Sequence, residues 1–418
     1  MTRHSLASIF LLCILAIAAA RQGGPAHALT TITVTTVGDE LNTDGDCSLR
    51  EAIQAANLNT AVDACAAGVG ADTIVLAAGT YTISRSGIDD TNANGDFDII
   101  TTNPSGERLT IQGAGAGSTR IDGGSLDRVL HVVSQLSELI LIDVTVQQGQ
   151  VTDVGGAGVL NWGTLRLERV VVRNNDVTGT SSDAIGGGLC NGCVTGTGQA
   201  TLIDTVIENN TAQRGGGIFT NRPLTISSSS IINNTAVAGG GITNYGDLSL
   251  TNTTVSGNTG TNNTGAISQS GGALAIASST VSHNTSPNVG GISAGSGTTT
   301  LKNTIVAQNS GSDCSGTLTS QGHNLSDDPT CAALFTASGD ITTTDALLGP
   351  LQDNGGPTVT RALLPGSLAF NTGTNTGCPA TDQRGIARPQ ARTCDIGAYE
   401  REAVLIDIYL PLVLKNTP

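Results

Sequence analysis

A nine-residue pattern recurs through the middle of the chain and constrains its fold more than any other feature. In each copy two apolar residues stand five positions apart, and an asparagine follows three positions after the second. The six copies are Leu167–Asn175, Leu202–Asn210, Ile226–Asn234, Leu250–Asn258, Ile276–Asn284 and Leu301–Asn309. Their terminal asparagines are 35, 24, 24, 26 and 25 residues apart. Self-similarity near this period is the signature of a solenoid.

The spacing within each copy favours strands over helices. In most copies another apolar residue stands two positions before the first, which is the alternation of a β-strand. Stacked coils place their strands in parallel ladders and pile aliphatic side chains into one core. We therefore predict an all-β fold, a right-handed parallel β-helix with roughly ten coils at the usual strand spacing, over residues 71–325. A β-sandwich is the competing architecture, but it would not keep a fixed register between copies.

The recurring asparagines are expected to stack at one corner of the coil. Each side-chain amide would bond the equivalent group one coil away, as in cross-β ladders. The predicted ladder comprises Asn175, Asn210, Asn234, Asn258, Asn284 and Asn309. The glycine-rich turns that follow most copies are expected to supply the positive φ angles that sharp corners need.

The composition agrees with a narrow, stacked core. Aromatic residues make up 2% of the chain, with a single tryptophan, Trp162, whereas glycine occurs 55 times. Globular cores usually draw much of their buried area from Phe, Tyr and Trp. Here the core must be filled by Val, Ile, Leu and Ala.

The N-terminus resembles a secretory signal. Residues 1–28 contain the apolar run Leu6–Ala20 and the cleavage pattern Ala26-His27-Ala28, with Ala18–Ala20 as the alternative site. A retained anchor is the competing interpretation, but the run is short for the ~20 residues of a membrane span. Signal removal leaves 34 acidic against 17 basic side chains. We therefore expect a secreted or cell-surface protein without a transmembrane span in the mature chain, and exclude nucleic-acid binding through a basic surface.

Eight cysteines follow the signal and are expected to form disulfides in an oxidising compartment. Sequence alone does not fix their connectivity, and local pairing is our interpretation. The pairs are Cys47/Cys65, Cys190/Cys193, Cys314/Cys331 and Cys378/Cys394. A redox or zinc site is the alternative for the Cys-x-x-Cys pair, although a zinc site needs two further ligands.

The two ends of the solenoid need caps. Within residues 29–70 we predict a strand and an amphipathic helix, Cys47–Asn57, with a capping box formed by Ser48 and Glu51. Residues 326–402 are rich in Pro and Gly and are predicted to form an irregular, disulfide-bearing cap at the other end. Residues 403–418 form an apolar tail, too short to span a bilayer.

Several strings resemble a known family of exported bacterial proteins. Cys47–Ala52 spells CSLREA and resembles the signature of the CSLREA-domain family. Residues 348–400 are similar to the choice-of-anchor type of C-terminal domain, through GPLQDNGGPT, LLPGS, CPATDQRG and CDIGAYE. The middle resembles the right-handed β-helices of the pectin-lyase-like fold and of polymorphic outer-membrane proteins. The resemblance implies export, surface association and a β-helix, and it implies no particular reaction.

One loop carries a candidate metal site. Oxygen-bearing side chains alternate along it with a glycine in sixth place, as at the start of a Ca²⁺ loop. The candidate ligands are Asp90, Asn92, Asn94, Asp96 and Asp98. The twelfth position is Thr101 rather than Glu, so a bidentate ligand is missing, and an Asn/Asp/Gly-rich turn is the competing interpretation. Ca²⁺ is the one cofactor that the sequence suggests.

Catalytic constellations are sparse, and we assign no catalytic residue. The Gly-x-Ser-x-Gly string occurs once, at Gly291–Gly295, within the repeat region, and the remaining histidines are far apart. We expect a non-enzymatic scaffold or adhesin-like protein that contacts an extracellular or cell-envelope partner, for which a polysaccharide is a candidate. The alternative is a polysaccharide lyase or glycoside hydrolase with its site between residues 83 and 153. A cleft with three carboxylates and an arginine would favour the enzyme, and a flat polar face the scaffold.

Overall fold

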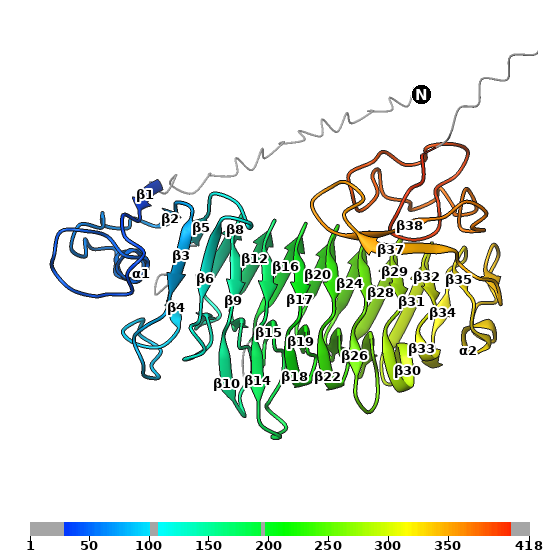
Figure 1. Ribbon diagram of the computed structural model, residues 1–418, viewed down its shortest axis with the longest axis horizontal. Coiled ribbons are helices and arrows are strands. Elements are labelled where there is room, and N and C mark those ends of the chain that lie inside the picture. Colours follow the sequence, from blue (N-terminus) through cyan, green and yellow to red (C-terminus); the bar gives the residue numbers. More distant parts are fainter. Residues whose placement is uncertain (1–28, 101–107, 194–196, 403–418) are drawn as a thin grey trace, which may run out of the picture.

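The computed structural model describes residues 29–100, 108–193 and 197–402. Within them the chain winds into an elongated parallel β-helix, as predicted (Figure 1). The predicted signal peptide, residues 1–28, and the apolar tail, residues 403–418, lie outside the described residues. Two of the three long sheets contain 11 strands each, so the estimate of roughly ten coils is approximate.

The first and second sheets run the length of the column. The first consists of β1 (Leu29–Thr33), β2 (Ala71–Val75), β5 (Arg108–Gln112), β8 (Glu138–Ile142), β12 (Thr164–Glu168), β16 (Gln199–Ile203), β20 (Leu224–Ser227), β24 (Leu248–Thr251), β28 (Ala273–Ala277), β31 (Thr298–Lys302) and β34 (Thr319–Ser320). The second consists of β3 (Gly79–Thr82), β6 (Thr119–Asp122), β9 (Thr145–Gln147), β13 (Val171–Arg173), β17 (Val206–Glu208), β21 (Ser230–Ile232), β25 (Thr254–Ser256), β29 (Thr280–Ser282), β32 (Ile305–Ala307), β35 (Leu325–Ser326) and β36 (Ile341–Thr342).

The third sheet has two rows of strands joined through one long strand, β30 (Thr285–Ala294). One row is β10 (Gln150–Thr152), β14 (Asp176–Thr178), β18 (Thr211–Arg214), β22 (Thr235–Ala238) and β26 (Thr259–Gly260). The other is β4 (Phe97–Ile99), β7 (Leu130–Val132), β11 (Val159–Asn161), β15 (Leu189–Asn191), β19 (Ile218–Thr220), β23 (Ile242–Asn244) and β27 (Ile267–Gln269). Strand β33 (Ser310–Gly316) also pairs with β30.

The apolar positions of the repeat form continuous inward columns. Leu167 pairs in register with Leu202, which pairs with Ile226, and the same register continues to Leu301. A second column passes through Val172 in the second sheet. These side chains are completely or almost completely buried and belong to one hydrophobic core.

The asparagine ladder forms as the repeat predicts. The Asn175 amide donates to Asn210 Oδ1 at 2.9 Å, and equivalent bonds of 2.9–3.0 Å link each later pair to Asn309. Asn309 Nδ2 in turn donates to Asp313 Oδ1 at 2.8 Å. Each internal amide also reaches a main-chain carbonyl of the preceding coil. The ladder therefore satisfies the buried asparagine amides at this corner and ends at the Asp313 carboxylate.

Glycine supplies only part of the corner geometry. The third residue of each nine-residue copy lies at the corner between the first and second sheets. Its φ is positive in all six copies, at Arg169, Asp204, Ser228, Asn252, Ser278 and Asn303. These residues have side chains, so the expectation that glycines shape the corners was wrong at this one. Glycines do so before the third sheet, where Gly186, Gly215 and Gly239 have φ of 63–65°. A Cβ at Gly215 would lie 2.2 Å from a main-chain oxygen.

A helix closes the N-terminal end. Helix α1 (Leu49–Leu58) starts at Ser48, whose hydroxyl accepts from the Glu51 N–H while the Glu51 carboxylate accepts from the Ser48 N–H. This is the predicted capping box. Leu49, Ala52 and Ile53 are buried and join the main core, so the helix covers the first coil.

The C-terminal residues cover a flank more than an end. Short helix α2 (Pro329–Ala332) and Phe335 close the last coils and join the main core. Residues 348–402, with the antiparallel hairpin β37 (Leu348–Gln352) and β38 (Thr360–Leu363), pack beside the second sheet (Figure 1). Gln383 Nε2 donates to Ser230 Oγ at 3.0 Å, and Arg361 Nε donates to Ser256 Oγ at 2.9 Å. The second sheet is therefore covered from β21 onwards.

Four disulfides join the chain locally. They are Cys47–Cys65, Cys190–Cys193, Cys314–Cys331 and Cys378–Cys394, the pairs expected from the sequence. Neither helix in the described residues has the length and apolar character needed to cross a bilayer.

Candidate functional site

The candidate site lies on the outer face of the third sheet, near the N-terminal end. Side chains alternate along a strand, so Phe97 and Ile99 of β4 enter the core while Asp98 faces outward. The register places Asp98 beside His131 of β7, and His131 beside Leu160 of β11. An aspartate, a histidine and a leucine thus form one outward column on adjacent coils.

A loop between β3 and β4 folds over this column and is held by the capping helix. Arg50 of α1 is fully buried, and its Nε lies 2.5 Å from Asp39 Oδ1. Its terminal nitrogens donate to the main-chain oxygens of Asn92, Gly95 and Asp96 at 2.7–3.3 Å. One guanidinium therefore fixes the loop that brings Asp90 over the sheet.

Two adjoining cavities lie beside the loop. The first, of about 380 Å³, is lined by Asp90, Arg128, His131, Val154, Gly155, Leu160, Trp162, Asp183 and Cys193. The second, of about 430 Å³, is lined by Ile88, Ser125, Leu126, Asp127, Arg128, Gln150, Val151, Thr152 and Val154. They share Arg128 and Val154, so together they offer a surface hollow longer than either alone.

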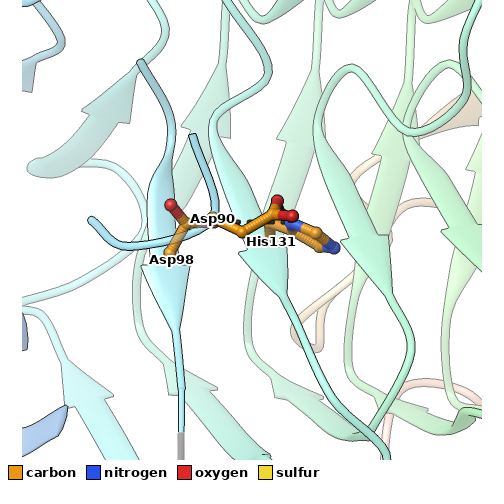
Figure 2. A group of neighbouring side chains, drawn as sticks. All are labelled: Asp90, Asp98 and His131. Carbon is orange, nitrogen blue, oxygen red and sulfur yellow. Dashed lines mark ion pairs between the residues drawn. The ribbon is translucent and has the colours of Figure 1, made fainter. Parts of the chain in front are cut away.

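His131 occupies an unusual polar position at the base of the first cavity. Its Nδ1 lies 3.3 Å from Asp90 Oδ1 and 3.3 Å from Asp98 Oδ1. Figure 2 shows the Asp98 and His131 side chains on neighbouring strands, with Asp90 reaching them from the overlying loop. His131 is 1% exposed, yet neither of its ring nitrogens has a hydrogen-bond partner, and neither has Asp98 Oδ1. A buried polar atom without a partner is uncommon and calls for an explanation, such as a catalytic role or an ion.

Trp162 forms one wall of the first cavity. Its indole meets the His131 ring edge to face, with centroids 4.5 Å apart. It packs on a small apolar cluster outside the main core that contains Leu160, Phe219 and the Cys190–Cys193 disulfide. The structural bridge interpretation of the Cys-x-x-Cys pair thus agrees with its position beside the cavity.

Burial has the largest effect on the pKa values of the ionisable groups in this site. It lowers the pKa of His131 to about 4, and the Arg128 charge acts in the same direction. Burial also raises the pKa of Asp98 and of Asp96, although Asp96 forms a 3.1 Å ion pair with Arg128 Nη1. At neutral pH His131 is therefore an uncharged base with free lone-pair capacity.

The five predicted Ca²⁺ ligands make several different contacts in the structure. Asp90 and Asp98 meet at His131, as described. Asn92 Nδ2 donates to the main-chain oxygen of Arg50, and Asn94 Nδ2 donates to Asp89, whose carboxylate organises the turn. Asp96 pairs with Arg128. The loop is therefore a tightly bonded turn in which two of the five side chains share a site with a histidine.

Comparisons with known proteins bear on the fold. No protein-family model and no curated protein matches the chain. The crystal structure of the pectate lyase Pel9A is similar over 91% of this chain and 98% of that chain, with a TM-score of 0.59 and 14% sequence identity. The chain has a pectin-lyase-like fold. At this identity the likeness concerns the fold alone.

His131, Trp162 and Arg128 were not predicted from the sequence as members of one site. A usable signal was present in the strands themselves. Leu130-His131-Val132 and Phe97-Asp98-Ile99 each place a polar residue between two apolar ones. In a β-helix strand that residue faces outward, and its burial there requires a covering element.

Proposed function

We propose that this chain is an extracellular β-helix protein that binds a glycan in the hollow around Trp162 and His131. The observation that carries the proposal is the gathering of buried, unpartnered polar atoms beside the chain's single tryptophan. Besides His131 and Asp98, Trp162 Nε1 and Arg128 Nε belong to this group. Ligand sites combine an aromatic or apolar wall with a few convergent polar groups. Sugars match such a site because their rings have apolar faces and their hydroxyl groups are polar.

The shape of the hollow favours an oligomeric ligand. Two cavities meet at Arg128, and the second is bordered by Ile88 and Leu126, which are 92% and 52% exposed. Exposed apolar side chains grouped at a cavity commonly mark a binding surface. A chain of several sugar units fits a two-part hollow better than a single small molecule does.

Export and surface association are part of the same proposal. The predicted signal peptide, the four disulfides and the resemblance to CSLREA-domain proteins support an oxidising, extracellular location. The similarity of residues 348–400 to choice-of-anchor domains supports attachment to the cell surface. In this account the β-helix is a scaffold or adhesin-like rod with one localised glycan site, and its cellular partner is a polysaccharide.

A second candidate function is cleavage of a polysaccharide. Asp90 and Asp183 line the first cavity with Arg128, and Asp98 lies behind Asp90. This is the combination of three carboxylates and an arginine that would favour a lyase or hydrolase. Against it, the Arg128 guanidinium is already ion-paired with the buried Asp96 carboxylate and is not a free base. Binding without cleavage is therefore our first proposal.

A two-stage experiment tests both functions. The purified chain is applied to an array of neutral and acidic oligosaccharides, and bound glycans are then incubated with it in solution. We expect saturable binding to a subset of glycans of several units. Accumulation of unsaturated or shortened products would favour the enzyme instead. Absence of binding to every glycan class would contradict the proposal.

A further inference from the structure

We propose that Asp90, Asp98 and His131 form a binding site for a divalent transition-metal ion such as Zn²⁺. The proposal is independent of glycan binding. The three side chains each offer one ligand atom, and these atoms lie within 4.8 Å of one another. Each comes from a different part of the chain: Asp98 from β4, His131 from β7 and Asp90 from the overlying loop (Figure 2).

The distances fit ligands around a shared ion. His131 Nδ1 lies 3.3 Å from one oxygen of each carboxylate. With metal–ligand bonds of about 2.0–2.1 Å, two ligand atoms of a tetrahedral site lie about 3.3–3.4 Å apart. Neither contact has hydrogen-bond geometry, since His131 Nδ1 and Asp98 Oδ1 both lack a partner. A small movement of exposed Asp90 would bring the two carboxylate oxygens closer to each other.

The unpartnered histidine is what distinguishes this cluster from an ordinary acidic turn. Its ring is 1% exposed, its Nδ1 lies 3.3 Å from an oxygen of each carboxylate, and neither ring nitrogen has a hydrogen-bond partner in the protein. A second acidic group, Glu40, Asp44 and Asp46, contains no histidine and lies near the surface, although Asp46 Oδ1 also lacks a hydrogen-bond partner. We therefore place the metal at His131 and not at the second group.

The donor set selects the metal. Ca²⁺ prefers six to eight oxygen ligands, whereas here the protein supplies two oxygens and one imidazole nitrogen. That set suits zinc and its neighbours in the first transition row, with the remaining positions open to water or ligand. Asp90 is 62% exposed, so the open side of the site faces the first cavity. This site has fewer protein ligands than the Ca²⁺ loop predicted from the sequence, and one of them is a nitrogen.

Trp162 provides the readout. It is the chain's only tryptophan, and its ring centroid lies 4.5 Å from that of His131. Open-shell ions such as Ni²⁺ quench a neighbouring indole, while Zn²⁺ does not. Titration of the purified, metal-free chain with Ni²⁺ should quench its emission saturably, and Zn²⁺ should restore the emission by competition.

Three variants locate the ion. Asp90→Asn changes an exposed side chain and should raise the apparent Kd for Ni²⁺ by at least about tenfold, the size of effect seen when metal-site groups are altered. His131→Gln should abolish saturable quenching, with its thermal unfolding recorded to confirm folding. Asp183→Asn removes the same charge from the same cavity outside the cluster, and should bind as the parent does.

Three results would overturn the site. They are no saturable quenching up to ~1 mM Ni²⁺, the upper range of weak extracellular ion sites; equal loss in Asp90→Asn and Asp183→Asn; or displacement of Ni²⁺ by Ca²⁺ as readily as by Zn²⁺. The last would indicate an all-oxygen site elsewhere in the cavity. Because no glycan is present in the titration, failure of the glycan proposal would leave its outcome unchanged.

Discussion

The Trp162 indole and the His131 imidazole meet in a T-shaped contact, with ring planes at 86°. The two residues are 31 positions apart in the sequence and come together because β7 and β11 pair in register. Edge-to-face contact of this kind adds about 0.5–1.5 kcal/mol beyond the buried area. It also joins the aromatic wall of the first cavity to the buried polar cluster.

Replacing Arg50 should destabilise the N-terminal end and loosen the loop that carries Asp90. Arg50→Ala removes the guanidinium partner of the Asp39 carboxylate, which is 2% exposed and keeps only main-chain N–H donors, and it removes the donor to three main-chain oxygens. Removing one member of a buried ion pair costs about 3–5 kcal/mol. Chemical denaturation followed by circular dichroism measures the loss.

The matched control for that variant is Arg166→Ala. Arg166 pairs with Glu168 on the surface, where the two side chains are 39% and 25% exposed. An exposed pair contributes less than about 1 kcal/mol. Equal losses in Arg50→Ala and Arg166→Ala would show that Arg50 does not organise the cap.

Breaking the asparagine ladder in its middle should weaken the whole column. Asn234→Ala removes donors to Asn258 and to the Ile207 carbonyl and the acceptor for Asn210. Unsatisfied buried groups cost about 1–3 kcal/mol each. Thermal or urea unfolding of this variant is compared with Asn262→Ala, whose side chain is exposed on a turn. Equal unfolding midpoints for Asn234→Ala and Asn262→Ala would contradict a stabilising role for the ladder.

Stability should fall as pH rises through the acidic to neutral range, partly through Asp313. Burial raises the pKa of this carboxyl to about 7, with the Asp327 charge acting in the same direction. At a pH between the pKa of Asp313 in the unfolded chain and its pKa in the folded chain, the folded chain binds the proton more tightly. Ionisation of Asp313 therefore favours unfolding, and its unfavourable effect grows from about pH 4 to about pH 7.

The test is a set of unfolding curves between about pH 5 and pH 8, a window over which this linkage is measurable. The fall in unfolding midpoint should be smaller for Asp313→Asn, which keeps an oxygen to accept from Asn309 but carries no titrating proton. An identical pH profile in the variant would remove Asp313 from the explanation.

The repeated part of the fold could be predicted because each coil restates the same constraints. Leu202, Ile207 and Asn210 recur at fixed spacing in the next coil, so pairing, core and ladder all follow from one period. The capping helix was visible for a local reason, since Ser48 and Glu51 stand at capping-box spacing.

The grouping of Asp98 with His131 and the flanking position of residues 348–402 were not predicted, because neither feature repeats. Asp98 and His131 are 33 residues apart, across a coil with no fixed period, so the sequence gives no register between them. The flanking segment is indicated only weakly by the sequence of the strands that it covers. Outward positions change from Arg173 and Glu208 in β13 and β17 to Ser256 and Ser282 in β25 and β29, where a second layer covers them. Small side chains on one outer face indicate a covering element in hindsight.

The central claim is that glycan binding depends on the hollow around Trp162. The most direct measurement is glycan-array binding by Trp162→Ala beside Tyr245→Ala, which removes a partly exposed aromatic from the same outer face of the third sheet. The account predicts that Trp162→Ala loses most of its binding while Tyr245→Ala keeps the parent level. Undiminished binding in a folded Trp162→Ala variant would contradict it.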